Sequence, residues 1–159
     1  FDLESPYIEN AIFESCKIKK DVVEKDEKET ELRKILNFGH TFAHSYEAAL
    51  NYSKKLNHGE AVILGIITAL KFSLQKNYIK KNEYDLIINH FKETKIPLNI
   101  RKYFSLKDLN KILFFMTKDK KNSTDKINLI LLKRIGLPIM TREFGKNQLK
   151  IFLKNELRN

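Results

Sequence analysis

The segment from His58 to Gln75 limits the fold more than any other part of the sequence, because it is apolar on nearly every side of a helix. Its apolar positions include Ala61, Val62, Leu64, Ile66, Ile67, Leu70 and Phe72. A helix with this pattern is stable only where other elements cover it. The chain has 159 residues, which is enough for one domain with a real core. We therefore predict a buried helix inside a helical domain.

Start signals and helical spacing of apolar residues predict further helices around this one. They are expected to begin at Ser5-Pro6, to run from Leu32 to Leu50, to begin near Asn82 and at Ser105, and to run from Leu149 to Leu157. In the first of these helices the expected buried stripe consists of Ile8, Ile12, Phe13, Cys16, Val22 and Val23. The polar segment from Asn51 to Asn57 is expected to be a loop.

One small β element interrupts this helical pattern. Residues 127–132 are rich in β-branched residues and leucine, Gly136 can turn the chain, and residues 137–144 can pair back as a hairpin. No expected strand leads into a glycine-rich phosphate loop, so a dinucleotide fingerprint is missing. The predicted fold is mainly α, a single bundle-like domain over residues 1–159 with a small β-hairpin.

Composition excludes several classes of function. The net charge is +10, but the lysines are scattered among Asp and Glu, which favours a solvated basic surface over an anionic-ligand site and disfavours nucleic acid. No apolar run approaches the roughly 18 residues of a membrane span. A single cysteine, Cys16, excludes an internal disulfide and a cysteine metal cluster, and is expected to be a buried thiol. A reducing cytoplasm fits this usage.

Three of the four histidines fall within a short segment and predict a metal site. His40 and His44 are four residues apart, so they point from one helix face, and His58 opens the next helix. Three imidazoles, or two with a carboxylate, form a usual zinc set with one open position. Spacing alone leaves open a surface or core histidine pair with a helix-capping His58. His90 stands apart and is expected to be structural or exposed.

Arg33 and Asn37 precede His40 at spacings that extend one polar stripe along the expected helix from Leu32 to Leu50. Polar groups on a helix with buried flanks need partners, and an anionic, hydroxyl-rich ligand would supply them. A solvated helix face is the alternative.

Residues 33–47 read RKILNFGHTFAHSYE, which resembles the signature R-x-x-LNFGHTFGH-x-x-E of the dehydroquinate synthase family. Residues 58–62, HGEAV, are similar to a second segment of that family. Residues 19–29 resemble its K-x-x-VV-x-x-DE-x-E stretch and residues 116–121 its M-x-x-DKK element. The resemblance covers nearly the whole chain. Ala43 departs from it, standing where the family usually has glycine, which should matter only if helices touch there.

The resemblance implies a role for each matching residue. His40 and His58 would bind the metal, zinc or cobalt, with a glutamate that lies upstream of this chain. His44, Lys19 and Arg33 would be catalytic. The substrate would be held by Lys19, Arg33, Asn37, His44 and Lys120, although Lys121 is adjacent and the register there is open. Glu47 is expected, from the chemistry of metal-bound histidines, to orient a ligand imidazole.

The reaction implied by the resemblance is the conversion of a seven-carbon keto-acid phosphate (DAHP) to 3-dehydroquinate, a lyase reaction of the shikimate pathway. NAD⁺ would be bound mainly by a preceding domain, so this chain is expected to hold no cofactor-binding residue. It begins at Phe1 without an initiating Met and is expected to be cut from a longer protein or processed. We expect the isolated chain to be inactive.

Two other readings remain open at this point. The first is another sugar-phosphate cyclase, of the inosose or valiolone synthase type, and the second is a non-catalytic helical module that binds a metal or phosphate. The family resemblance further implies a homodimer in the cytoplasm that acts on a small phosphorylated substrate, without nucleic acid or membrane.

Overall fold

The structure is a computed structural model that describes residues 5–93, 99–118 and 126–158. It divides into two compact units, residues 1–37 and residues 38–159. The extent of the chain as one domain stays a prediction, and each unit is described by itself. No helix of the described residues is long and apolar enough to cross a membrane.

The first unit holds one long helix, α1, and a short 3-10 helix, η1. Their bounds are Tyr7–Lys25 for α1 and Leu32–Asn37 for η1. The expected buried stripe of α1 (Ile8, Ile12, Phe13, Cys16, Val22 and Val23) is wrong, because no residue of α1 is buried and Cys16 is exposed. Among the described residues of this unit η1 packs against α1, and the apolar side chains of Ile12, Phe13 and Ile18 are exposed.

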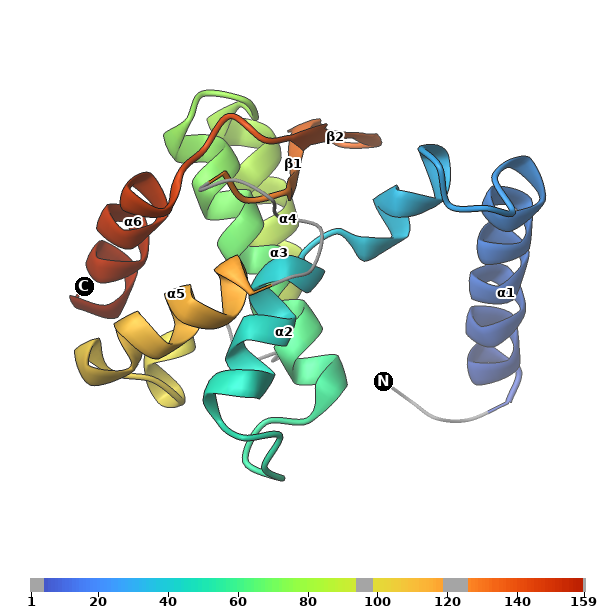
Figure 1. The fold of residues 1–159 in the computed structure, drawn as a ribbon. Coiled ribbons are helices and arrows are strands. Elements are labelled where there is room, and N and C mark those ends of the chain that lie inside the picture. The colour runs from blue at the N-terminus through green and yellow to red at the C-terminus, as the bar shows by residue number, and fades with distance from the viewer. Residues whose placement is uncertain (1–4, 94–98, 119–125, 159) are drawn as a thin grey trace. The chain divides into compact units, whose positions relative to one another are not determined.

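The second unit holds five helices, two 3-10 turns and a hairpin among its described residues. The bounds are α2 His40–Ala49, α3 His58–Gln75, α4 Lys81–Glu93, η2 Ile100–Lys102, η3 Leu106–Asp108, α5 Leu109–Thr117, β1 Leu129–Arg134, β2 Leu137–Thr141 and α6 Lys146–Arg158. In Figure 1, α3 runs through this unit, with α2, α4 and β1 against it, while α5 packs on α2 and α6. The predicted fold, mainly helical with a small hairpin, is confirmed.

The expected central helix is present with the predicted bounds, and half of its residues are buried. Its start is fixed by a capping interaction in which Glu60 accepts a hydrogen bond from the backbone N–H of Asn57 at 3.0 Å. On its buried face Thr68 bonds the Tyr46 hydroxyl of α2 at 2.9 Å. Ser73 accepts the backbone N–H of Leu132 at 3.1 Å, which ties β1 to α3.

The expected helix from Leu32 to Leu50 is wrong, because the chain breaks at Gly39. There φ is +84°, a conformation that glycine adopts without steric cost, and α2 begins only at the next residue. Arg33 and Asn37 therefore lie on η1, in the first unit, and not on the helix that carries His40 and His44. The single polar stripe predicted from spacing does not exist.

The close approach of α2 and α3 depends on two glycines that face each other. A Cβ atom added to Gly65 would lie 2.2 Å from the carbonyl oxygen of Gly39 and 2.9 Å from the backbone nitrogen of Ala43. The helices thus touch at Ala43, whose side chain is fully buried. The missing Cβ of Gly65 leaves the room that lets the two backbones meet.

We predict that Gly65→Ala lowers the free energy of unfolding by about 2 to 3 kcal/mol, because the added methyl group forces α2 and α3 apart. Urea denaturation followed by circular dichroism measures this loss. Gly59→Ala is the matched control, since a Cβ there meets nothing within 4 Å, and it should change stability by less than about 0.5 kcal/mol. Equal stability of the two variants would contradict the tight contact.

Candidate metal and substrate site

Three histidine rings converge between the first two turns of α2 and the first residue of α3. The ring centroids lie 5.4 Å apart for His40 and His44, 6.0 Å for His40 and His58, and 6.3 Å for His44 and His58. Two imidazoles that bind one zinc ion through nitrogen at about 2.1 Å have centroids roughly 5 to 6 Å apart. The predicted convergence of the three histidines is therefore present, and the His40–His44 and His40–His58 distances fall within the range for a pair of ligands.

A carboxylate holds the ring of His58. The Nδ1 atom of His58 lies 3.0 Å from the Oε1 atom of Glu47, whose side chain is only 12% exposed. An ionised carboxylate only accepts hydrogen bonds, so Nδ1 is the donor in this contact and Nε2 is the ring nitrogen on the other side. This contact agrees with the predicted orienting role of Glu47.

His40 is arranged in the same way by a backbone carbonyl. Its Nδ1 atom faces the carbonyl oxygen of Phe38 in a long contact of 3.4 Å. A carbonyl oxygen also only accepts, so Nδ1 is the donor in this contact. The centroid distances do not choose among the three histidine pairs, so His40 and His58 as the metal ligands stay a prediction.

The residues of this chain fit part of a metal site. Imidazole nitrogens of two histidines are suitable zinc or cobalt ligands. Across the described ranges, no set of three or more His, Cys, Asp or Glu side chains is arranged to hold a metal ion by itself. A ligand pair completed by a residue from elsewhere stays a prediction.

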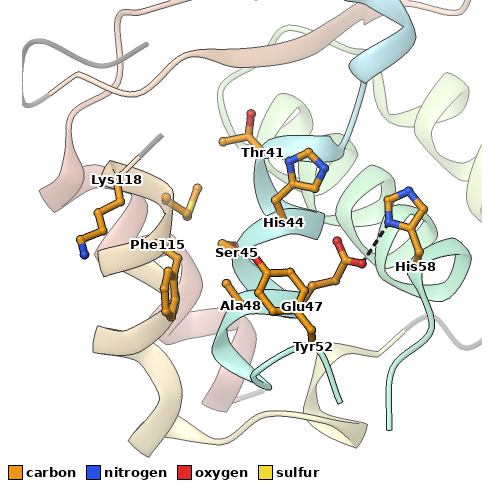
Figure 2. Close-up of a pocket in the computed structure, with 10 residues that line it drawn as sticks. Thr41, His44, Ser45, Glu47, Ala48, Tyr52, His58, Phe115 and Lys118 are labelled. Carbon is orange, nitrogen blue, oxygen red and sulfur yellow. Dashed lines mark hydrogen bonds and ion pairs between the residues drawn. The ribbon is translucent and has the colours of Figure 1, made fainter. Parts of the chain in front are cut away.

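A pocket of about 560 Å³ opens beside the histidines. Its lining residues are Thr41, His44, Ser45, Glu47, Ala48, Tyr52, His58, Phe115, Met116 and Lys118. Figure 2 shows His44, His58 and Glu47 on one side of the pocket. Phe115, on α5, and Lys118, the residue after α5, lie on the other side. The cavity thus combines a polar wall, an apolar wall and one cation.

Several of these lining residues were not expected from the sequence. Thr41, whose hydroxyl donates to the carbonyl of Asn128 at 3.1 Å, lies in the expected motif but carried no assigned role. Tyr52 follows Asn51, and asparagine favours left-handed turns. This neighbour is the sequence feature that indicates a turn at Tyr52. Phe115 and Lys118 reach the site through the packing of α5 on α2, which no sequence spacing reveals.

Lys19, Arg33 and Asn37 belong to the first unit, and their convergence with the histidines stays a prediction. Lys19 is exposed on α1. Arg33 donates from Nη1 to the carbonyl of Glu27 at 2.8 Å, and Asn37 donates from Nδ2 to Glu29 at 2.8 Å.

Two further expectations concern residues away from the described site. Lys120 and its neighbour Lys121 lie outside the described residues. His90 is exposed on α4 and contacts Phe91, as expected for a residue without a role in the site.

Asp26 organises the turn that carries Arg33. Its carboxylate accepts the backbone N–H groups of Thr30, Glu31 and Arg33 at 2.8–2.9 Å and the Thr30 hydroxyl at 3.0 Å. The N–H groups of Arg33 and Thr30 hold the pKa of Asp26 well below its usual range. The carboxylate therefore stabilises the conformation between α1 and η1.

Comparison with known proteins gives first the class of fold. A 2-epi-5-epi-valiolone synthase from Streptomyces hygroscopicus, solved with NAD⁺ and Zn²⁺ bound, matches with a TM-score of 0.69 at 17% identity, over 86% of this chain and 36% of that one. A 2-deoxy-scyllo-inosose synthase, solved with carbaglucose-6-phosphate, NAD⁺ and Co²⁺, matches with a TM-score of 0.66 at 24% identity, over 86% and 38%. The chain thus has a fold found in sugar-phosphate cyclases.

Sequence comparison then gives the family. The family model described as 3-dehydroquinate synthase C-terminal matches residues 1–122. The 3-dehydroquinate synthase of Pelagibacter ubique is 57% identical over 155 residues, which are 98% of this chain and 42% of that protein. That of Endomicrobium trichonymphae is 42% identical over 134 residues, 84% of this chain and 36% of that protein. The chain belongs to the 3-dehydroquinate synthase family and spans about two fifths of the length of these relatives.

We predict that Asp26→Asn removes the hydrogen-exchange protection of the Thr30, Glu31 and Arg33 amides, because an amide side chain accepts fewer of these bonds. In the unchanged chain the ionised carboxylate of Asp26 makes its full contribution to the stability of the turn at pH values above the unfolded pKa of about 3.9. Its contribution declines as pH falls below that value toward the lowered pKa. NMR-detected exchange between pH 3 and 7 measures both effects.

Asp21→Asn, at an exposed position of α1, is the control and should leave those amides protected. Unchanged protection in Asp26→Asn would show that the carboxylate does not hold the turn.

Proposed function

We propose that this chain supplies the metal pair and most of the substrate-binding residues of an enzyme that converts DAHP to 3-dehydroquinate and phosphate, as a lyase of the shikimate pathway. The observation that carries the proposal is the convergence of the His40, His44 and His58 rings beside a pocket that His44, His58 and Glu47 line. Membership of the 3-dehydroquinate synthase family supports it.

In this proposal each residue acts on the substrate through simple chemistry. Lys19, Arg33 and Lys120 neutralise the carboxylate and phosphate, and Asn37 bonds a hydroxyl group. His44 lines the pocket and, since imidazole exchanges protons near neutral pH, moves a proton beside the phosphate. Thr41 and Glu47 form part of the polar wall of the pocket.

His40 and His58 would hold the metal through Nε2, with a third ligand from another part of the enzyme. When bound, zinc or cobalt polarises a substrate oxygen, and NAD⁺ takes up and returns a hydride. Glu47 would keep the ring of His58 in the ligand orientation, as its contact with Nδ1 supports. We propose that NAD⁺ is bound mainly by a preceding domain and that the enzyme is a cytoplasmic homodimer without nucleic acid or membrane partners.

Another cyclase activity, on an inosose or valiolone precursor, is the second candidate. It draws support from the shared fold, but the identities to those structures are 17% and 24%, against 57% to a protein named 3-dehydroquinate synthase. The reading as a non-catalytic metal-binding module assigns no ligand to the pocket beside the histidines, so it accounts for less of the structure.

The activity is tested with the enzyme in which this chain is joined to a nucleotide-binding domain. We expect loaded enzyme to release phosphate from DAHP and to form 3-dehydroquinate, detected by coupled absorbance and mass spectrometry, and the isolated chain to form none. Turnover of another sugar phosphate instead of DAHP would favour the second candidate. Dehydroquinate formation by the isolated chain would overturn the need for a second domain.

The metal site is tested by chelator competition and by the absorption spectrum of the cobalt-loaded enzyme. We expect His58→Ala to abolish stoichiometric metal binding, and Glu47→Ala to weaken it about 10- to 100-fold, because His58 then loses its orienting partner. Glu47→Gln keeps one acceptor oxygen and should lose less.

His90→Ala is the matched histidine control and should bind metal like the unchanged enzyme. Full metal affinity in His58→Ala would remove this histidine from the ligand set, and full affinity in Glu47→Ala would remove the orienting role of the carboxylate.

A further inference from the structure

The loop after α2 contains two successive residues in the left-handed backbone region. Asn51 and Tyr52 both have φ of +53°. Asparagine enters this region readily, whereas a bulky aromatic residue there is a genuine outlier. The other described non-glycine residues with positive φ are Glu29 and Asn77. Among these four described residues, Tyr52 alone is aromatic.

Hydrogen bonds to the end of α2 hold this conformation. The backbone N–H of Tyr52 donates to the carbonyl of Glu47 at 2.8 Å, and that of Asn51 donates to the carbonyl of Ala48 at 3.1 Å. Glu47 thus holds the backbone of Tyr52 with its carbonyl and the ring of His58 with its carboxylate. The unusual turn and the metal-binding histidine share one anchoring residue.

Burial does not explain the strain. The Tyr52 residue is 75% exposed, so its ring gains little from packing in the fold. Within the described part of the chain its hydroxyl forms no hydrogen bond. Strained residues persist where the surroundings fix them, and they gather at functional sites. Tyr52 lines the pocket together with Glu47 and His58, and Figure 2 places all three around it.

The position of the ring suits the substrate class of the proposed function, on which this step rests. A polyhydroxylated carbon chain or ring presents C–H faces and hydroxyl groups. An aromatic ring packs on such a face, and a phenol bonds a hydroxyl or phosphate oxygen. Phe115 lines the same pocket from α5 and offers a second aromatic surface.

We propose that Tyr52 is a substrate-binding residue: its ring packs on the carbon skeleton of the phosphorylated substrate, its hydroxyl bonds a substrate oxygen, and the left-handed backbone aims it into the pocket. Because the contact is made equally in the bound substrate and the transition state, its loss raises KM and leaves kcat nearly unchanged.

The test uses the joined enzyme with DAHP as the substrate. Tyr52→Gly removes the ring and relieves the backbone, so we expect KM to rise at least 10-fold, kcat to stay within about 3-fold, and Tm to rise by about 1 to 3 °C. Tyr52→Phe keeps the ring and loses the hydroxyl, and should raise KM about 5-fold, the value of one neutral hydrogen bond.

Asn51→Gly is the matched control, because it alters the backbone of the same turn and leaves the ring in place. We expect its KM to equal that of the unchanged enzyme. The proposal is overturned by an unchanged KM in Tyr52→Gly, by an equal rise of KM in Asn51→Gly, or by a marked fall of Tm in Tyr52→Gly, which would make the ring a structural element.

The Phe variant decides the part played by the hydroxyl, since an unchanged KM there would leave binding to the ring alone. An unchanged enzyme that forms no dehydroquinate would sink the proposed function. An active enzyme whose KM ignores Tyr52 would sink only the role of this residue.

Discussion

The contact between the backbones of Gly39 and Gly65 sets the geometry on which the candidate site depends. Since neither residue carries a Cβ atom, the start of α2 lies directly against Gly65 and Ile66 of α3, and Glu47 near the end of α2 reaches His58 at the start of α3. His40 and His44 are thereby brought within about 6 Å of His58. A histidine pair on a lone helix would be a surface feature, and the neighbouring helix makes it a possible ligand set.

Most of the helical elements could be predicted from sequence because their signals are local. The apolar pattern of residues 58–75 and the capping group of Glu60 define α3 within the sequence itself. The break at Gly39 was missed since an apolar pattern runs through it, and only the tertiary contact with Gly65 reveals why a glycine in a left-handed conformation is required there. The exposed face of α1 was missed because amphipathic spacing shows which side can be buried and not what covers it.

The site was predictable to a similar extent. His40, His44, His58 and Glu47 were found through motif spacing and the known need of ligand imidazoles for partners. Tyr52, Phe115 and Lys118 were not, because a pocket joins residues from separate elements. Lys19, Arg33 and Asn37 lie in the first unit, where the network of Asp26 orders the chain around Arg33. This network arises from backbone amides, which leave no trace in residue identity.

Glu47 forms hydrogen bonds with two residues on either side of the loop that follows α2. Its carbonyl accepts the backbone N–H of Tyr52, and its carboxylate contacts the ring of His58. Five residues separate the two positions that it anchors. An inserted or deleted residue between them would shift one partner out of reach while the other stayed in place. Surface loops usually tolerate insertions and deletions. In this loop we expect substitutions but no change in length. The length of the loop therefore belongs to the site as much as its side chains do.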